Sequence, residues 1–263
     1  RQGGGRNRAL REARGCFVMF LDADDALAPD AVRMCVEAAS GDRADMVVFD
    51  YLRNCPSIGL REPVCQLGED AAALRGDELR RRLIGRTTPV WSAMYDKSLI
   101  TDNNLFFPEH VFYEDNAVAL AIQLSASNPV KINAPLYLYR FDNASVTRSV
   151  NNYRFFDRLS SAVTLLGNLH RLGLYSPFAD EIDFLFLNQY YVHTIFGCIY
   201  RFDRVPMKRL RYVRNTVGRY VAHHRRNPFY RLQSFGMKVK IESHARFPRA
   251  IKMLSLLKRR VIG

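Results

Sequence analysis

The sequence predicts an α/β protein that continues into a helical C-terminal region. Between residues 6 and 50, segments with the apolar spacing of helices alternate with short, wholly apolar segments of strand length. Beyond Val150 the pattern is helical. A length of 263 residues, with 48% hydrophobic and 25% charged residues, suffices for one sizeable core and a smaller second unit. We therefore expect two domains, residues 1–150 and residues 151–263.

The N-terminal elements alternate in type. Residues 6–15 form a helix that closes at a glycine. Residues 16–21 are a continuous apolar segment, typical of a buried parallel strand. Residues 29–40 form a helix whose first turn holds a proline, and residues 46–50 form another strand. This order predicts a mostly parallel sheet, which places ligands at the carboxyl ends of its strands.

The middle of the chain is less regular. Residues 51–73 contain prolines and glycines that predict loops with a short hairpin. Residues 116–125 are almost all apolar and predict a helix buried on most of its surface. The other expected elements are a helix at 77–84, a strand at 90–95, a short helix at 97–102, and helices at 154–170 and 180–200.

Charge is distributed unevenly along the chain. Residues 1–200 hold 21 Lys and Arg against 24 Asp and Glu, whereas residues 201–263 hold 18 against 2. In residues 207–214 and 251–260 the cations alternate with apolar side chains, as in amphipathic helices on membranes. No nucleic-acid-binding motif accompanies them, so we expect no nucleic acid partner. An anionic membrane surface bound through residues 201–263 and an ordinary solvated helix face both explain the pattern.

The sequence shows no sign of export. No apolar segment approaches the roughly 18 residues of a spanning helix, and the N-terminus lacks the hydrophobic part of a signal peptide. The five cysteines are odd in number and form no C-x-x-C pair, which argues against a disulfide framework or a zinc site. We expect a cytoplasmic protein at the inner face of a bacterial-type cell membrane.

Three aspartates, Asp22, Asp24 and Asp25, follow the apolar segment of residues 16–21. Carboxylates this close repel one another unless solvent or a divalent cation screens them. An Mg²⁺ or Mn²⁺ ion held by one or two of them, with water and phosphate oxygens as its other ligands, would neutralise a diphosphate leaving group. The alternative is a loop in which the aspartates cap the next helix, before Ala31.

A second acidic pair, Glu114 and Asp115, precedes the apolar helix of residues 116–125. Aspartate is a favoured residue at the start of a helix, where the helix dipole stabilises its charge. The functional alternative is a general base that removes a proton from an attacking hydroxyl group.

Three further features have both a functional and a structural interpretation. Arg140 and Arg148 could bind phosphates, or be solvated residues of a strand and turn. The glycines at positions 3–5 could cradle a phosphate before a helix, although the segment lacks the G-K-[ST] ending of a P-loop. Trp91 suits the core or a wall on which a substrate stacks.

In this order, the clusters resemble the family 2 glycosyltransferases of the GT-A fold. The resemblance covers residues 3–150 and rests on Gly5-Arg6-Asn7-x-Ala9-Leu10, Phe20-Leu21-Asp22-Ala23-Asp24-Asp25, Trp91-x-x-Met94-Tyr95, Leu105-x-Phe107-Pro108-Glu109, Tyr113-Glu114-Asp115 and Leu136-Tyr137-x-Tyr139-Arg140. It implies an α/β fold, a partial GT-A domain that is Rossmann-like with a mostly parallel sheet, over residues 1–150. Residues 151–263 would be the helical, basic C-terminal region.

The resemblance also implies roles for residues. Asp22 and Asp24 would form the family's D-x-D motif, which contacts the ribose of the nucleotide sugar and the divalent metal, Mg²⁺ or Mn²⁺. Asp115, with Glu114 beside it, would match the acid pair that supplies the catalytic base. The expected nucleotide-sugar site comprises Arg6, Asn7, Asp22, Asp24, Trp91 and Arg140.

The implied reaction is an inverting transfer of sugar from a UDP- or GDP-sugar donor to a hydroxyl of a cell-surface glycan or lipid-linked acceptor. Asp115 would deprotonate the hydroxyl, and metal at Asp24 would stabilise the departing nucleoside diphosphate. The family's usual first strand, V-S-V-I-I-P-x-Y-N, and its V-D-D-G-S segment are absent. We expect the chain to be a fragment of a longer protein, because a sheet without those strands would have a bare edge.

Two other functions fit parts of the sequence. Residues 22–27 are near the D-x-D-G-T-L motif of haloacid-dehalogenase-like phosphatases, but Asp25 and Ala26 replace its Gly and Thr, and no G-D-x-x-x-D motif follows. The chain could also be a non-catalytic membrane-associated remnant. A remnant would not be stabilised by Mn²⁺ with UDP or GDP.

Overall fold

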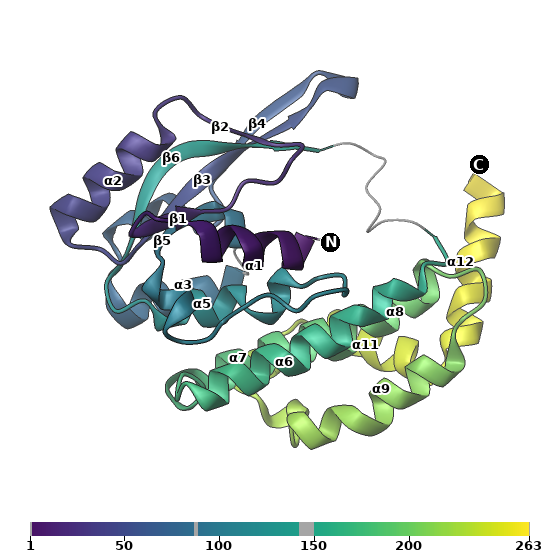
Figure 1. The fold of residues 1–263 in the computed structure, drawn as a ribbon. Helices are drawn as coiled ribbons and strands as arrows, with labels where there is room; N and C mark the ends of the chain where they lie inside the picture. Colours follow the sequence, from purple (N-terminus) through teal and green to yellow (C-terminus); the bar gives the residue numbers. More distant parts are fainter. Residues whose placement is uncertain (1, 87–88, 142–149, 263) are drawn as a thin grey trace. The chain divides into compact units, whose positions relative to one another are not determined.

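A computed structural model describes residues 2–86, 89–141 and 150–262 (Figure 1). The chain forms two compact units. Unit 1 comprises Arg1–Asn143 and Val163–Phe178, and unit 2 comprises Ala144–Ala162 and Ala179–Gly263. Unit 1 contains the strands and unit 2 is helical. Arg148, for which a phosphate contact is predicted, lies outside the described residues.

Unit 1 has the α/β character that the sequence predicts. Its strands are β1 (Phe17–Met19), β2 (Ala26–Leu27), β3 (Met46–Cys55), β4 (Leu60–Val64), β5 (Ala93–Asp96) and β6 (Pro129–Arg140). Its helices are α1 (Gln2–Glu12), α2 (Ala31–Asp42), α3 (Gly76–Arg86), α4 (Ser98–Thr101) and α5 (Ala119–Ser125).

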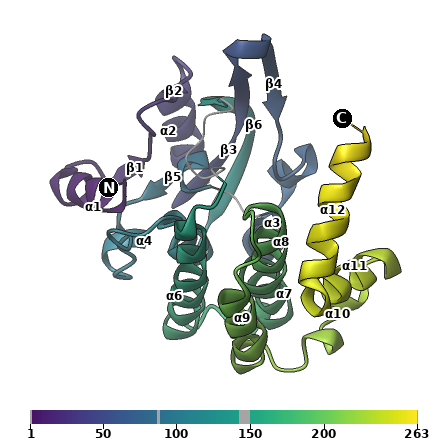
Figure 2. The ribbon, with the colours of Figure 1, turned by 90° about the vertical axis from the view of Figure 1, so that its right-hand side faces the viewer.

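The strands of unit 1 form one mixed sheet. Among the described residues the strand order is β1-β5-β3-β6-β2, with β4 also paired to β3. The β3–β6 pair is parallel, whereas β1–β5, β2–β6, β3–β4 and β3–β5 are antiparallel. Figure 2 shows β3, β4 and β6 running side by side.

The prediction of a mostly parallel sheet is therefore wrong. The apolar segment 16–21 contributes only β1, which is half-buried and antiparallel to β5. An apolar segment indicates burial but not strand direction, which depends on the connections. The chain turns directly from β3 into β4 at Gly59, whose φ of 65° suits glycine. Between β3 and β6 it passes through helices, as parallel strands require.

The core of unit 1 lies around β3 and α5. Residues 46–49 of β3 are at most 1% exposed, and every residue from Ala119 to Leu124 in α5 is buried. These observations confirm the predicted strand and the predicted buried helix. Residues 115–117 form a separate 3₁₀ turn, so the α-helix begins at Ala119.

The N-terminal glycines have a packing role in α1. They lie inside this helix, so the expected glycine loop before a helix is wrong. A Cβ atom on Gly3 would lie only 2.4 Å from the carbonyl oxygen of Pro108. A Cβ atom on the exposed Gly5 would meet nothing within 4 Å. Helix α1 thus packs closely on the segment around Pro108 because Gly3 has no side chain.

We expect Gly3→Ala to lower the free energy of unfolding by about 1–3 kcal/mol, because the methyl group overpacks this contact. Gly5→Ala is the matched control, and it should leave stability unchanged or raise it by up to about 1 kcal/mol through helix propensity. Urea unfolding of both variants measures the difference. Equal stability of the two variants would contradict the close approach.

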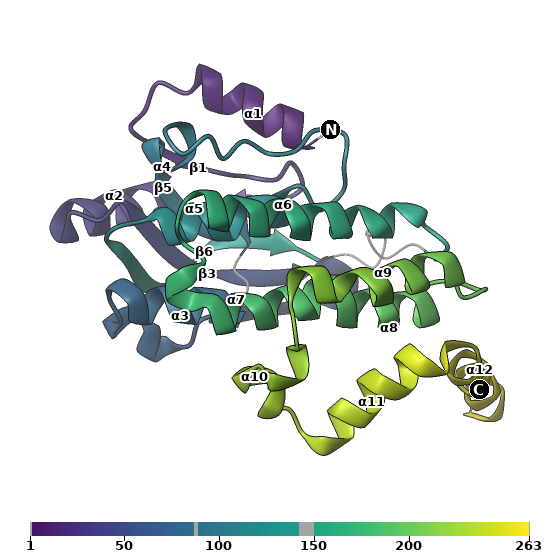
Figure 3. The same cartoon turned by 90° about the horizontal axis from the view of Figure 1, so that it is seen from below.

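Unit 2 confirms the helical C-terminal region. Its helices are the first part of α6 (Asp157–Arg171), α7 (Ala179–Phe186), α8 (His193–Tyr200), α9 (Met207–Tyr220), α10 (Pro228–Arg231), α11 (Phe235–Arg246) and α12 (Pro248–Ile262). A π-helical turn, Leu187–Val192, connects α7 and α8. Figure 3 shows α8 and α9 side by side, and α11 leading into α12. No helix of the described residues is long and apolar enough to cross a membrane.

Candidate active site

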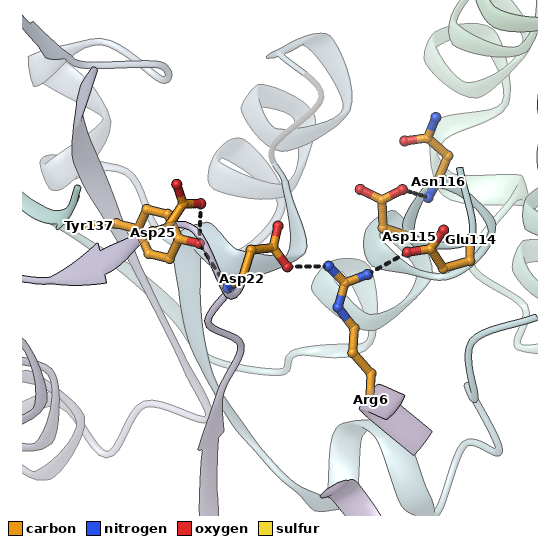
Figure 4. Close-up of polar contacts among 7 residues, drawn as sticks. All are labelled: Arg6, Asp22, Asp25, Glu114, Asp115, Asn116 and Tyr137. Carbon is orange, nitrogen blue, oxygen red and sulfur yellow. Dashed lines mark hydrogen bonds and ion pairs between the residues drawn. The ribbon is translucent and has the colours of Figure 1, made fainter. Parts of the chain in front are cut away.

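Arg6 joins two acidic segments that are far apart in the sequence. From α1, its Nη2 atom lies 2.6 Å from Asp22 Oδ1 and its Nη1 atom 2.7 Å from Glu114 Oε1 (Figure 4). The guanidinium group also lies 5.4 Å from the centre of the Phe107 ring. The side chains of Arg6 and Glu114 are only 12% and 6% exposed, so water screens this ion pair weakly. The fold therefore brings together Arg6, Asp22 and the Glu114–Asp115 pair.

The loop after β1 is fixed to β6 through Asp25. The Tyr137 hydroxyl donates to Asp25 Oδ2 at 2.6 Å and accepts from the backbone N–H of Asp22 at 3.2 Å. The backbone N–H of Arg140 donates to Asp25 Oδ1 at 2.7 Å. Burial raises the pKa of Asp25, although these hydrogen bonds oppose the shift. No local pattern distinguishes Asp25 from the neighbouring aspartates, because its partners lie on a strand that is distant in the sequence.

The capping alternative for these aspartates is not what the structure contains. Helix α2 begins at Ala31, and its N-cap residue is Asp30, without a side-chain capping bond. Asp22 instead binds Arg6, Asp25 binds β6, and Asp24 is exposed between them. The three neighbouring aspartates thus have three different environments.

Glu114 and Asp115 do not cap α5 either, since its N-cap residue is Val118. They follow Tyr113, whose φ of 61° places it in the left-handed region that non-glycine residues rarely adopt. Asp115 Oδ1 accepts from the backbone N–H of Asn116 at 2.9 Å (Figure 4). Burial raises the pKa of both Glu114 and Asp115, and the charge of Arg6 opposes both shifts.

Two predicted nucleotide-sugar residues support the site from within the protein. The Asn7 amide is buried, and it donates to the carbonyl oxygen of Phe107 at 2.8 Å and accepts from its N–H at 2.9 Å. Trp91 is 8% exposed and stacks on the rings of Tyr137 and Tyr139, with centroids 4.3 and 5.4 Å away. Trp91 thus packs against Tyr137, the residue whose hydroxyl group hydrogen-bonds Asp25. The Arg140 side chain is exposed.

The acidic residues fit a cation that takes only one or two protein ligands. The described residues contain no group of three or more His, Cys, Asp or Glu side chains arranged to hold a metal ion. Asp24 is exposed, and Asp22 uses Oδ1 for Arg6. Mg²⁺ and Mn²⁺ accept carboxylate oxygens and complete their coordination with water and phosphate oxygens. Asp22 and Asp24 have the chemistry that such an ion requires.

Comparison with known proteins links this chain to glycosyltransferases. Residues 1–94 match the model of the Glycosyl transferase family 2. Over 189 residues, 68% of this chain and 53% of the relative, the chain is 26% identical to the putative glycosyltransferase EpsH of Bacillus subtilis. It is 24% identical over 193 residues to the uncharacterized glycosyltransferase YibD of Escherichia coli, covering 68% of this chain and 56% of YibD. The chain thus spans about half the length of these relatives.

A solved structure shares the fold. S. aureus TarS 1-349 aligns with 92% of this chain and 68% of its own length, at 17% sequence identity and a TM-score of 0.59.

The family match includes residues 22–27, on which the phosphatase alternative depended, and so favours a glycosyltransferase motif there. Over residues 1–94 this chain is thus similar to the Glycosyl transferase family 2.

Proposed function

We propose that the protein transfers a sugar from a nucleotide-sugar donor to a hydroxyl group of a glycan or lipid-linked acceptor, with inversion. The observation that best supports this reaction is the pairing of Arg6 with both Asp22 and Glu114, at 2.6 and 2.7 Å. It brings Asp22, a proposed ligand of a diphosphate-bound cation, next to the Glu114–Asp115 pair, which includes the proposed base. An inverting transfer uses a base and a cation at one site, because the acceptor oxygen loses its proton as the anomeric carbon loses the diphosphate.

Asp115 acts as the general base in this proposal, with Glu114 held beside it by Arg6. The acceptor oxygen attacks the anomeric carbon and its proton passes to Asp115, while the bond to the diphosphate oxygen breaks and the nucleoside diphosphate leaves with the electron pair. The raised pKa of Asp115 suits this role, since a base is most effective when its pKa approaches the working pH. Asp24 and Asp22 would hold Mg²⁺ or Mn²⁺, whose charge would stabilise the diphosphate.

The donor site is expected to extend from Arg6 and Asp22 toward Arg140, the exposed arginine whose backbone is bonded to Asp25. An arginine side chain can bind a phosphate with two parallel hydrogen bonds. In this proposal Asn7 and Trp91 support the donor site through their contacts with Phe107 and Tyr137. The nucleotide is of the UDP or GDP type.

Thermal unfolding of the protein tests the donor site. With Mn²⁺ together with UDP or GDP, we expect a rise in Tm, because a ligand at 100 times its Kd stabilises by about 2.7 kcal/mol. Mn²⁺ or nucleotide separately should give a smaller rise. Asp24→Asn should remove the combined effect, whereas Asp30→Asn, at the exposed N-cap position of α2, should preserve it.

The same measurement separates an enzyme from a non-catalytic remnant. An unchanged Tm with every combination of Mn²⁺ and nucleotide would favour the remnant. If the combination raises Tm, release of UDP or GDP from a panel of nucleotide sugars identifies the donor. An Asp24→Asn variant that keeps the full rise in Tm would contradict the assignment of Asp24 as a metal ligand.

A further inference from the structure

Helix α12 presents an apolar stripe to solvent. Ala250, Met253, Leu254 and Leu257 follow the spacing that places side chains on one face of a helix, and all four are exposed. Met253 is 62% exposed, Leu254 59% and Leu257 49%. The opposite side of the helix is the packed one, where Pro248 is buried and neighbouring residues are half-buried. The stripe is thus not part of the core of unit 2.

Helix α9, the other basic amphipathic segment, behaves differently. Its apolar residues Leu210, Val213 and Val217 are at most 5% exposed, and its basic residues Lys208 and Arg211 are in solvent. Burial of the apolar side accounts fully for the amphipathic pattern of α9. The apolar side chains of this pattern are therefore packed inside the protein in α9, whereas those of α12 are exposed to solvent.

The charge of α12 indicates which surface its stripe would meet. Residues 248–262 contain no Asp or Glu, and the exposed Arg249 adjoins the stripe. The neighbouring helix α11 exposes Phe235 and Val239 together with Lys240. A second copy of this cationic region would be repelled, whereas a surface that is both apolar and anionic complements it in both respects.

We propose that α12 docks on a bilayer that contains anionic phospholipids. Met253, Leu254 and Leu257 enter the boundary between headgroups and acyl chains, while Arg249 remains at the phosphates. Lys and Arg side chains near an anionic membrane surface are attracted to it, so the net positive charge of residues 201–263 strengthens the binding. The inference stands independently of the transfer reaction.

Co-sedimentation of the protein with phospholipid vesicles tests the proposal. We expect binding to vesicles of phosphatidylglycerol and phosphatidylcholine at low salt, and at least tenfold weaker binding to phosphatidylcholine alone. The triple variant Met253→Gln, Leu254→Gln, Leu257→Gln keeps every charge and should lose at least tenfold in affinity. Because the three side chains are already exposed, its Tm should match that of the unmodified protein.

Val32→Gln together with Val36→Gln is the matched control, since both valines are exposed on helix α2 of unit 1. This control should bind vesicles normally. Unchanged binding by the triple variant would overturn the proposal, as would a lack of binding to anionic vesicles at low salt. Sedimentation velocity without lipid supplies a further test, because a dimer that the triple variant abolishes would assign the stripe to a second copy instead.

Discussion

Replacing Arg6 with methionine is expected to lower the free energy of unfolding by about 3–5 kcal/mol at neutral pH, because it leaves a buried carboxylate without its cation. Glu114 is buried, and the positive charge of Arg6 opposes the rise in pKa of both Glu114 and Asp115. Methionine keeps much of the apolar volume of the arginine side chain. The loss is therefore mainly electrostatic, and urea unfolding measures it.

The dependence on pH identifies the cause. Without Arg6, the folded-state pKa values of Glu114 and Asp115 rise further above their unfolded values. A carboxyl group with a raised folded pKa favours the folded state at low pH, and this contribution is lost as pH rises through that pKa. The deficit of Arg6→Met should therefore be largest at about pH 7 and smaller near pH 4.5, where carboxyl groups begin to bind protons.

Arg8→Met provides the control, because Arg8 pairs with Glu12 on the solvent side of the same helix, where both side chains are more than 65% exposed. Such pairs contribute about 0.3–0.5 kcal/mol. We expect this small loss at every pH above the carboxyl range. A deficit of Arg6→Met that is equally large at both pH values would show that packing on Phe107, rather than charge, accounts for the role of Arg6.

Asp115→Asn is expected to lower the rate of sugar transfer by about 10²–10⁴-fold, the usual contribution of a general base. The same change should raise thermal stability, since burial disfavours the charged carboxylate and the Asn amide oxygen can still accept from Asn116. A gain in stability with a loss of activity distinguishes a catalytic group from a structural one. Initial rates and thermal unfolding measure the two effects.

The binding of Mn²⁺ with UDP or GDP should be unchanged in Asp115→Asn, because Asp115 acts on the acceptor and not on the donor in this mechanism. Asp42→Asn, at the end of α2, is a control that should transfer sugar normally. In the unmodified protein, kcat/KM should fall as pH drops through the raised pKa of the base, and this decline should be absent from the residual activity of the variant. Normal transfer by Asp115→Asn would exclude Asp115 as the base.

The sequence pattern was sufficient for the elements that apolar residues define. The elements β3 and α5 could be predicted because a continuous apolar segment by itself indicates an element that is buried on several sides. Strand β6, which begins at Pro129, was considered only around Arg140, as the structural alternative to a phosphate contact. Its buried Lys131 has no exposed side-chain surface and binds Asp50 Oδ2 at 3.0 Å. A lysine at a core position interrupts the alternation by which strands are identified, and its partner could not be known in advance.

The candidate site was predictable as a set of residues but not as an arrangement. Asp22, Glu114 and Asp115 were proposed from separate segments, and only the folded chain places Arg6 between two of them. The hydrogen bonds of Tyr137 to the Asp25 region depend on the pairing of β2 with β6. Such contacts between distant strands leave no local pattern. A single sequence therefore shows which groups carry chemistry more readily than which groups orient them.

The position of β3 in the sheet has a consequence for biosynthesis. This apolar strand is synthesised before its partners β5 and β6, which follow only after several intervening elements. Until they emerge, β3 can pair with β4 but not with β5 or β6, and nascent chains with such unpaired strand edges are prone to aggregate. We therefore expect chaperone supply and slow translation to affect the yield of this protein more than changes on its surface do.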